Sequence, residues 1–148
     1  MDIRVQESAF DAGAELNRFT AQAKRAGAVV SFTGIVRDTP DGDLERMEIE
    51  HYPGMTERAL VDIAQSAIDR WEISDVLVIH RFGALTAGET IMMVATASKH
   101  RVAAFEAAEY LMDYLKSRAP FWKKEFTKSG AEWVESKSDD ENALGRWT

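Results

Sequence analysis

The sequence predicts an α/β (α+β) fold built on a mixed, largely antiparallel sheet, with all 148 residues in one domain. Segments typical of strands are interleaved with segments in which apolar residues recur at helical spacing. Several predicted strands are separated only by short turns, which favours hairpins and antiparallel pairing. The composition, 45% hydrophobic and 29% charged, is that of an ordinary globular protein, and the length suits one compact domain.

The beginning of the chain is predicted to form a strand, a helix and a second strand. Residues 3–6 alternate weakly and predict a short strand. In "DAGAELNRFTAQAKRAG", Leu16, Phe19 and Ala23 lie at helical spacing, and Gly27 is expected to end the helix. The stretch "AVVSFTGIVR" is rich in β-branched residues and predicts a strand, which the turn "DTPDGD" follows.

A third strand and a second helix come next. In "LERMEIEHY", Met47, Ile49 and His51 alternate on one face of a strand, and Pro53-Gly54 ends it. "MTERALVDIAQSAIDRW" predicts an amphipathic helix. The residues expected to face inward are Leu60, Ile63, Ala67 and Trp71.

Two strongly apolar strands are predicted in the middle of the chain. They are "DVLVIHRF" and "TIMMVATA", joined by the loop "GALTAGE". Both are more apolar than a sheet with one wet face requires, which indicates burial against another surface. We therefore expect a stable homodimer.

The last third is predicted to contain the clearest helix and a hairpin. In "KHRVAAFEAAEYLMDYLKSRA", Phe105, Ala108, Met112 and Leu115 form the apolar stripe, and Pro120 ends the helix. "FWKKEF" and "AEWVES" flank "TKSG" and predict a hairpin. From about residue 137 we expect a polar tail that can form one helical turn.

Composition excludes several classes of function. The chain has no cysteine, which excludes disulfides, thiolate metal sites and a cysteine nucleophile and suits a reducing cytoplasm. The net charge of −7 disfavours general binding to nucleic acid or anionic membranes. No apolar run approaches the roughly 18 residues of a membrane span, and we expect no signal peptide.

A cationic cluster lies in "SKHRVAAF". Ser98 is the expected N-cap, so that Lys99, His100 and Arg101 occupy the first helical turn. Cations there oppose the helix dipole, whereas free backbone N–H groups attract anions. The cluster is therefore either a phosphate or carboxylate site or a solvated helix start with incidental charges.

A second cationic cluster surrounds the proline break in "DYLKSRAPFWKKEF". Lys116 is expected to be partly buried at the helix end, and burial lowers a lysine pKa and makes its amine a usable base or nucleophile. After the break, strand alternation puts Phe121, Lys123 and Glu125 on one face, with Lys124 on the other. Solvated surface lysines are the alternative.

Other candidates are isolated in the sequence. Arg37 follows a strand end, where binding residues are common, although a surface arginine has the same appearance. His51, His80 and His100 show no metal-ligand spacing, so we expect no metal site.

Five blocks together resemble a known family. "VVSFTGIVR", "EHYPGMTERAL", "VIHRFG", "ASKHRVAAFEA" and "YLKSRAPFWKKE" occur in the order found in the catalytic (large) subunit of molybdopterin synthase, the MoaE family. The resemblance covers residues 27–135. It implies a hammerhead-like α/β domain with an additional antiparallel β-hairpin portion.

The resemblance also implies a reaction and its partners. The family transfers sulfur from the C-terminal thiocarboxylate of a small ubiquitin-like subunit, on its Gly-Gly tail, to cyclic pyranopterin monophosphate. The product is the dithiolene of molybdopterin. The large subunits form a homodimer within a heterotetramer, and no cofactor or metal is implied.

Seven positions match residues to which the family gives a role. By this resemblance, Lys116 and Lys123 are catalytic, Lys116 as a base or acyl acceptor. The implied substrate-binding residues are Arg37, His100, Arg101, Lys116, Lys123, Lys124 and Glu125. The match departs at Ile35, where many members carry a lysine. The alternatives are a non-catalytic docking module for a ubiquitin-like partner and a Schiff-base enzyme built on Lys116.

Overall fold

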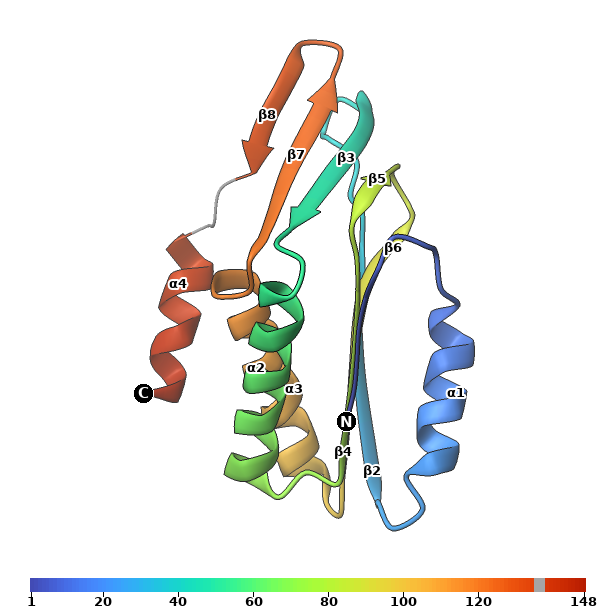
Figure 1. Ribbon diagram of the computed structural model, residues 1–148, viewed down its shortest axis with the longest axis vertical. Coiled ribbons are helices and arrows are strands. Elements are labelled where there is room, and N and C mark those ends of the chain that lie inside the picture. The colour runs from blue at the N-terminus through green and yellow to red at the C-terminus, as the bar shows by residue number, and fades with distance from the viewer. Residues whose placement is uncertain (135–137) are drawn as a thin grey trace.

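A computed structural model of the protein describes residues 1–134 and 138–148, in which two four-stranded sheets are combined with four α-helices (Figure 1). The strands are β1 (Asp2–Gln6), β2 (Ala28–Ile35), β3 (Leu44–His51), β4 (Asp75–Arg81), β5 (Gly83–Leu85), β6 (Thr90–Ser98), β7 (Phe121–Thr127) and β8 (Gly130–Val134). The helices are α1 (Ala12–Gln22), α2 (Met55–Trp71), α3 (Arg101–Ser117), α4 (Ser138–Leu144) and the short 3₁₀ helix η1 (Gly145–Trp147). The predicted α/β class with a mixed, largely antiparallel arrangement is confirmed.

The first sheet has the strand order β1-β4-β6-β2. The β1–β4 pair is parallel, and the other pairs are antiparallel. Figure 1 shows α1 on one side of this sheet and α2 and α3 on the other. Leu77 and Ile79 pack with Phe19 of α1, whereas Val76 and Val78 belong to the larger core with α2 and α3.

This double cover corrects the reason given for a homodimer. The strongly apolar sequences of β4 and β6 are explained within one chain, because helices bury both faces of these central strands. Their composition therefore gives no evidence for a second copy. The prediction of a dimer has to rest on other surfaces.

The second sheet, β5-β3-β7-β8, is antiparallel throughout and extends beyond one end of the first (Figure 1). Its central pair places Ile49 opposite Lys123 and Met47 opposite Glu125. Met47 and Ile49 alternate along β3, as predicted, and both are buried. The predicted hairpin is present as β7–β8, and the last two residues of its predicted second strand, 135–136, lie outside the described residues.

Some boundaries differ from the predictions for local reasons. The predicted loop after β4 contains the short strand β5, which pairs with β3. Helix α1 ends at Gln22, so Gly27 does not end it. Gly27 instead donates its N–H to the Ser98 oxygen at 2.9 Å, and an added Cβ would lie 2.4 Å from the Lys99 oxygen. A close approach of two chain segments therefore requires this glycine.

Helix α3 buries a stripe that lies beside the predicted one. Phe105 was predicted to face inward, but it is 59% exposed. The small residue Ala104 is buried in its place, and Leu111 and Leu115 continue the stripe. Small side chains allow α3 to approach the sheet closely, which turns the larger Phe105 outward.

The C-terminal residues form more than the expected polar tail. Trp147 donates from Nε1 to Asp113 Oδ2 at 2.7 Å and packs edge-on against Trp71 and Tyr110. Arg146 pairs with Glu109 and Asp113 of α3. These contacts hold α4 and η1 against the outside of α3, as Figure 1 shows.

Candidate active site at the junction of the two sheets

A cavity of about 570 Å³ lies where the two sheets meet. Its apolar wall includes Met47, Ile91, Met92, Met112, Leu115 and Phe121. Its polar and charged lining consists of Thr33, Arg37, His80, Lys116, Lys123, Glu125 and Asp140. Ligand sites for small molecules typically have this size and this combination of apolar walls with a few polar groups.

Lys123 has the most perturbed environment among the lysines that the structure describes. Phe121, Lys123 and Glu125 lie on one face of β7, as predicted, and all three line the cavity. Burial lowers the pKa of the Lys123 amine, the nearby Lys116 charge lowers that pKa further, and the Asp140 carboxylate acts in the opposite direction. A lysine amine with a lowered pKa is a better base and nucleophile near neutral pH.

Lys116 lines the same cavity, but it is exposed. The prediction that it is partly buried was wrong, because Leu115 takes the inward position of the last α3 turn and leaves its neighbour at the rim. The partly buried lysine of the cavity is instead Lys123. The two lysines remain close enough to influence each other electrostatically.

A second hollow of about 500 Å³ adjoins the first and shares Lys116, Phe121 and Lys123 with it. Arg118, Trp122 and Trp133 line only the second hollow. The two lysines therefore stand between two compartments, one formed at the sheet junction and one beside the β7–β8 hairpin. Such an arrangement can present amines to two different molecules at once.

Lys124 lies outside both hollows. Its Nζ is 5.0 Å from the centre of the Trp133 ring and 5.6 Å from that of Phe126, on the face of β7 opposite Lys123. This orientation agrees with the predicted alternation. The structure thus brings Arg37 and Glu125 together with the two catalytic candidates but does not bring Lys124 into the same cavity.

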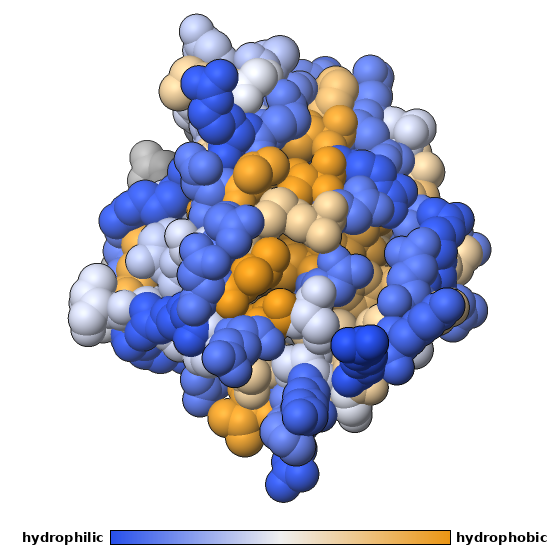
Figure 2. Space-filling model, turned by 60° about the horizontal axis from the view of Figure 1, so that its bottom comes forward, coloured by the Kyte–Doolittle hydropathy of each residue, from blue (hydrophilic) through white to orange (hydrophobic). Residues whose placement is uncertain are grey.

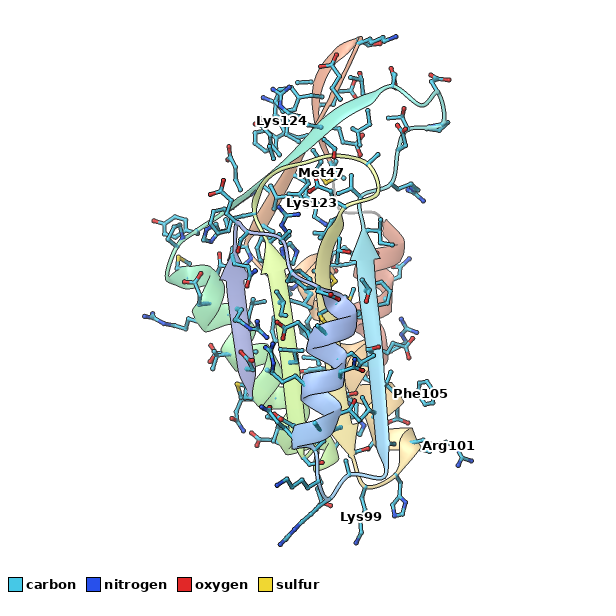
Figure 3. The ribbon with its side chains drawn as sticks, turned by 90° about the vertical axis from the view of Figure 1, so that its right-hand side faces the viewer. Met47, Lys99, Arg101, Phe105, Lys123 and Lys124 are labelled. Atoms are coloured by element: carbon cyan, nitrogen blue, oxygen red, sulfur yellow. The ribbon has the colours of Figure 1, made fainter. Side chains whose placement is uncertain are left out.

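His100 and Arg101 lie far from the lysine pair within one chain. Figure 3 shows Lys99 and Arg101 at one end of the molecule, with Lys123 and Met47 near the other. The helix also starts later than predicted: Ser98 is the last residue of β6, and His100 is the N-cap, without a side-chain capping bond. Arg101 alone of the three cations lies in the first turn.

His80 is a cavity residue that sequence reasoning did not select. Its ring is 4% exposed and stacks on Phe121 with 3.7 Å between centroids. Nδ1 lies 2.7 Å from the Arg81 carbonyl oxygen, so this nitrogen carries the proton. Burial lowers the pKa of His80 to about 3 and outweighs the opposing effect of the Arg81 bond, while the nearby Lys123 charge lowers that pKa further. In the sequence His80 is a histidine within an apolar strand, and nothing in that pattern indicates that it lines a cavity.

The part of the chain that the structure describes offers no support for a metal site or a membrane-spanning helix. No group of three or more histidine, aspartate or glutamate side chains there is placed to hold a metal ion. No described helix is long and apolar enough to cross a membrane.

Apolar surface gathers in the middle of one face of the molecule, with hydrophilic residues around it (Figure 2). The exposed large apolar side chains include Phe32 and Ile35 of β2 and Val102 and Phe105 of α3. Phe32 and Ile35 also line the larger cavity, and Val102 follows Arg101 directly. Both sets of candidate cations are therefore flanked by exposed apolar groups.

A lysine pair that lines two adjoining hollows has the arrangement of a group-transfer site, in which an amine can act as base or nucleophile between two bound molecules. The family model described as MoaE protein matches residues 5–118, and the chain belongs to this family. It is 62% identical over 147 residues to the molybdopterin synthase catalytic subunit of Cereibacter sphaeroides, covering 99% of this chain and all of that protein.

Solved structures give the same relationship. The molybdopterin biosynthesis MoaE protein from Burkholderia ambifaria superimposes with a TM-score of 0.83 at 48% identity, covering 99% of this chain and 98% of that one. Molybdopterin synthase from Staphylococcus aureus gives a TM-score of 0.81 at 31% identity, covering 89% and 96%.

Proposed function

We propose that this chain is the catalytic subunit of a molybdopterin synthase and that Lys116 and Lys123 act in its chemistry. The observation that carries the assignment is the 62% identity, over the whole length, to a protein of that name. The reaction moves sulfur from the C-terminal thiocarboxylate of a small ubiquitin-like subunit to cyclic pyranopterin monophosphate. This step forms the dithiolene of molybdopterin and belongs to molybdenum cofactor biosynthesis.

The chemistry requires an acceptor for the acyl group of the tail. Each transfer replaces a carbon–oxygen bond of the pterin by a carbon–sulfur bond, with loss of the oxygen substituent, and breaks the acyl–sulfur bond, so the acyl group must pass to water or to an amine. A base that takes a proton from water, or a neutral amine that attacks the acyl carbon, meets this need. Lys123 suits either role because its pKa is lowered, chiefly by burial.

The two hollows suggest a division of the site. The larger one, with an apolar wall and Arg37, suits the fused rings and phosphate of the pterin, since arginine binds phosphate in a bidentate manner. The smaller one, with Arg118 and two tryptophans, suits the extended tail of the small subunit. The exposed Lys116 then contacts the tail, and Lys123 faces both molecules.

His100 and Arg101 can join this site only from a second copy of the chain. Within one chain they lie at the opposite end of the molecule from Lys123 (Figure 3). In a two-fold dimer, however, one surface of each copy meets another surface of its partner twice. The exposed Val102 and Phe105 beside Arg101, and Phe32 and Ile35 beside the lysine cavity, supply apolar surface for such a contact.

Complementation tests this arrangement. Dimers of Lys123→Met alone and of Arg101→Ala alone should both be inactive. Mixed dimers should recover about half of the wild-type activity, because one of their two sites is intact. Recovery no greater than the sum of the two parent variants would show that these residues do not share a site across the dimer.

We infer a cytoplasmic location, because a chain without cysteine and a partner carrying a thiocarboxylate both suit a reducing compartment.

Reconstitution tests the function itself. The chain is mixed with thiocarboxylated small subunit and cyclic pyranopterin monophosphate, and molybdopterin is assayed as its oxidised fluorescent derivative. We expect product that depends on both reactants. Binding of the small subunit without any product would instead support a non-catalytic docking module.

A further inference from the structure

Helix α4 lies outside the stretch that matches the family model, but it is firmly attached to the core. The Ser117 hydroxyl donates to the Asp140 carbonyl oxygen at 3.2 Å, and Arg118 pairs with Glu141 at 3.2 Å. Leu144 is buried, and Arg70 donates to the Trp147 carbonyl oxygen at 2.7 Å. These contacts fix the start of α4 beside the last turn of α3, where Lys116 lies (Figure 1).

Asp140 is the α4 residue that reaches the catalytic cavity. It is half-buried and lines the cavity together with Lys116 and Lys123. Its neighbour Glu141 pairs instead with Arg118. Asp140 and Glu141 thus have different surroundings within one turn of α4, and of these two residues Asp140 alone contributes to the cavity wall.

Two lysines at a partly buried site repel each other and lose hydration, and a nearby carboxylate offsets both effects. We propose that Asp140 is a positioning residue for Lys123, whose carboxylate holds the lysine amine in the cavity and sets how readily it gives up its proton. This role rests on the proposed function of the lysine pair. It makes the C-terminal helix part of the active site.

Several other charged or titratable groups face Lys123 from the surrounding elements. They are Lys116 of α3, His80 of β4, Glu125 of β7, Arg37, which follows β2, and, in the second hollow, Arg118, which follows α3. His80 stays neutral above its pKa of about 3, so it does not counter the lysine charges near neutral pH. Asp140 differs from Glu125 because it comes from a separate element, attached through its own contacts, and because its charge acts to raise the pKa of Lys123.

The test compares Asp140→Asn with Glu141→Gln in the 148-residue chain. Both variants remove one negative charge from the same turn of α4, but only the first removes it from the cavity. Lysine side chains are labelled with ¹³C and ¹⁵N, and the Lys123 signal, identified from its loss in Lys123→Met, is titrated by NMR. The Asp140→Asn midpoint should fall below that of the wild type, and the Glu141→Gln midpoint should not move. Asp140→Ala should repeat the direction of Asp140→Asn.

The NMR readout separates this proposal from the catalytic one, because it requires neither partner nor substrate. An unchanged midpoint in folded Asp140→Asn, or an equal fall in Glu141→Gln, would overturn the role of Asp140. The rate of sulfur transfer is then measured against pH. If its lysine-dependent limb moves to lower pH with the NMR midpoint, both proposals are supported. If the NMR midpoint of Lys123 moves but the lysine-dependent limb of the pH–rate curve does not, the role of Asp140 is supported and the role of Lys123 as the base is overturned.

Discussion

Acidification should destabilise this protein through His80, and removal of the titrating ring should abolish that effect. His80 has a pKa of about 3 in the folded chain, chiefly because it is buried, whereas the ordinary value is 6.5. Between pH 6.5 and about pH 3 the unfolded chain binds a proton at His80 and the folded chain does not. The free energy of unfolding therefore has its full value above pH 6.5 and decreases as the pH is lowered. At about 1.4 kcal/mol per pH unit, the loss between pH 6.5 and 4.5 is about 3 kcal/mol.

The stability that depends on His80 is lost at higher pH than the stability that depends on the carboxylates. The pKa values of Glu15 and Glu89 are lowered, chiefly by the Arg4 side chain and by the Thr86 N–H, so the stability they contribute is lost only below about pH 4.5. His80→Phe keeps an aromatic ring over Phe121 and removes the titrating nitrogens. It should cost stability at pH 7, because the Arg81 carbonyl loses its donor, at about 1–3 kcal/mol.

Urea unfolding of both proteins at pH 7 and pH 4.5, at one protein concentration, measures the difference. The wild type should lose about 3 kcal/mol more than His80→Phe over this interval. Equal losses would refute the burial argument, because they would mean that His80 becomes protonated without penalty in the folded state.

Three further predictions concern charge, packing and assembly. Lys123→Met should raise the free energy of unfolding near pH 7, because burial lowers the Lys123 pKa. In urea titrations this gain in stability should shrink as the pH rises towards 10.5, and a gain that stays constant with pH would contradict the prediction. Gly27→Ala should cost about 1–3 kcal/mol in thermal unfolding, since its Cβ would lie 2.4 Å from the Lys99 oxygen, and an unchanged Tm would rule out this close contact. Sedimentation should show dimers at micromolar concentration, and Phe105→Glu should weaken them while leaving the fold intact; a purely monomeric wild type would contradict the shared site.

Much of the local structure could be predicted because short-range patterns determine it. The alternation of Phe121, Lys123 and Glu125 gave the correct face of β7, and the amphipathic pattern gave α2 with its observed ends. Long-range packing could not be obtained this way. The parallel pairing of β1 with β4 joins segments more than 70 residues apart, and nothing local in either strand specifies it.

The same holds for the candidate site: local patterns predict part of it, and long-range packing determines the rest. The resemblance selected Lys123, and strand alternation separated it from Lys124, but its partly buried environment depends on β3, β4 and α4 together. Lys116 was expected to be the buried lysine because a helical stripe alone does not show where the neighbouring elements lie. The sequence did not indicate Asp140, which lies in a stretch that looks like a polar tail. Its place in the cavity depends on the distant contacts of Arg146 and Trp147.

The central claim is that the Lys123 amine takes part in sulfur transfer through its neutral form. Single-turnover rates with saturating thiocarboxylated small subunit and pterin substrate test it directly in Lys123→Arg, because arginine keeps the charge but stays protonated. The variant should dock the small subunit normally and transfer sulfur about 10²–10⁴-fold more slowly, the usual contribution of a positioned base. Transfer by Lys123→Arg at close to the wild-type rate would contradict the account.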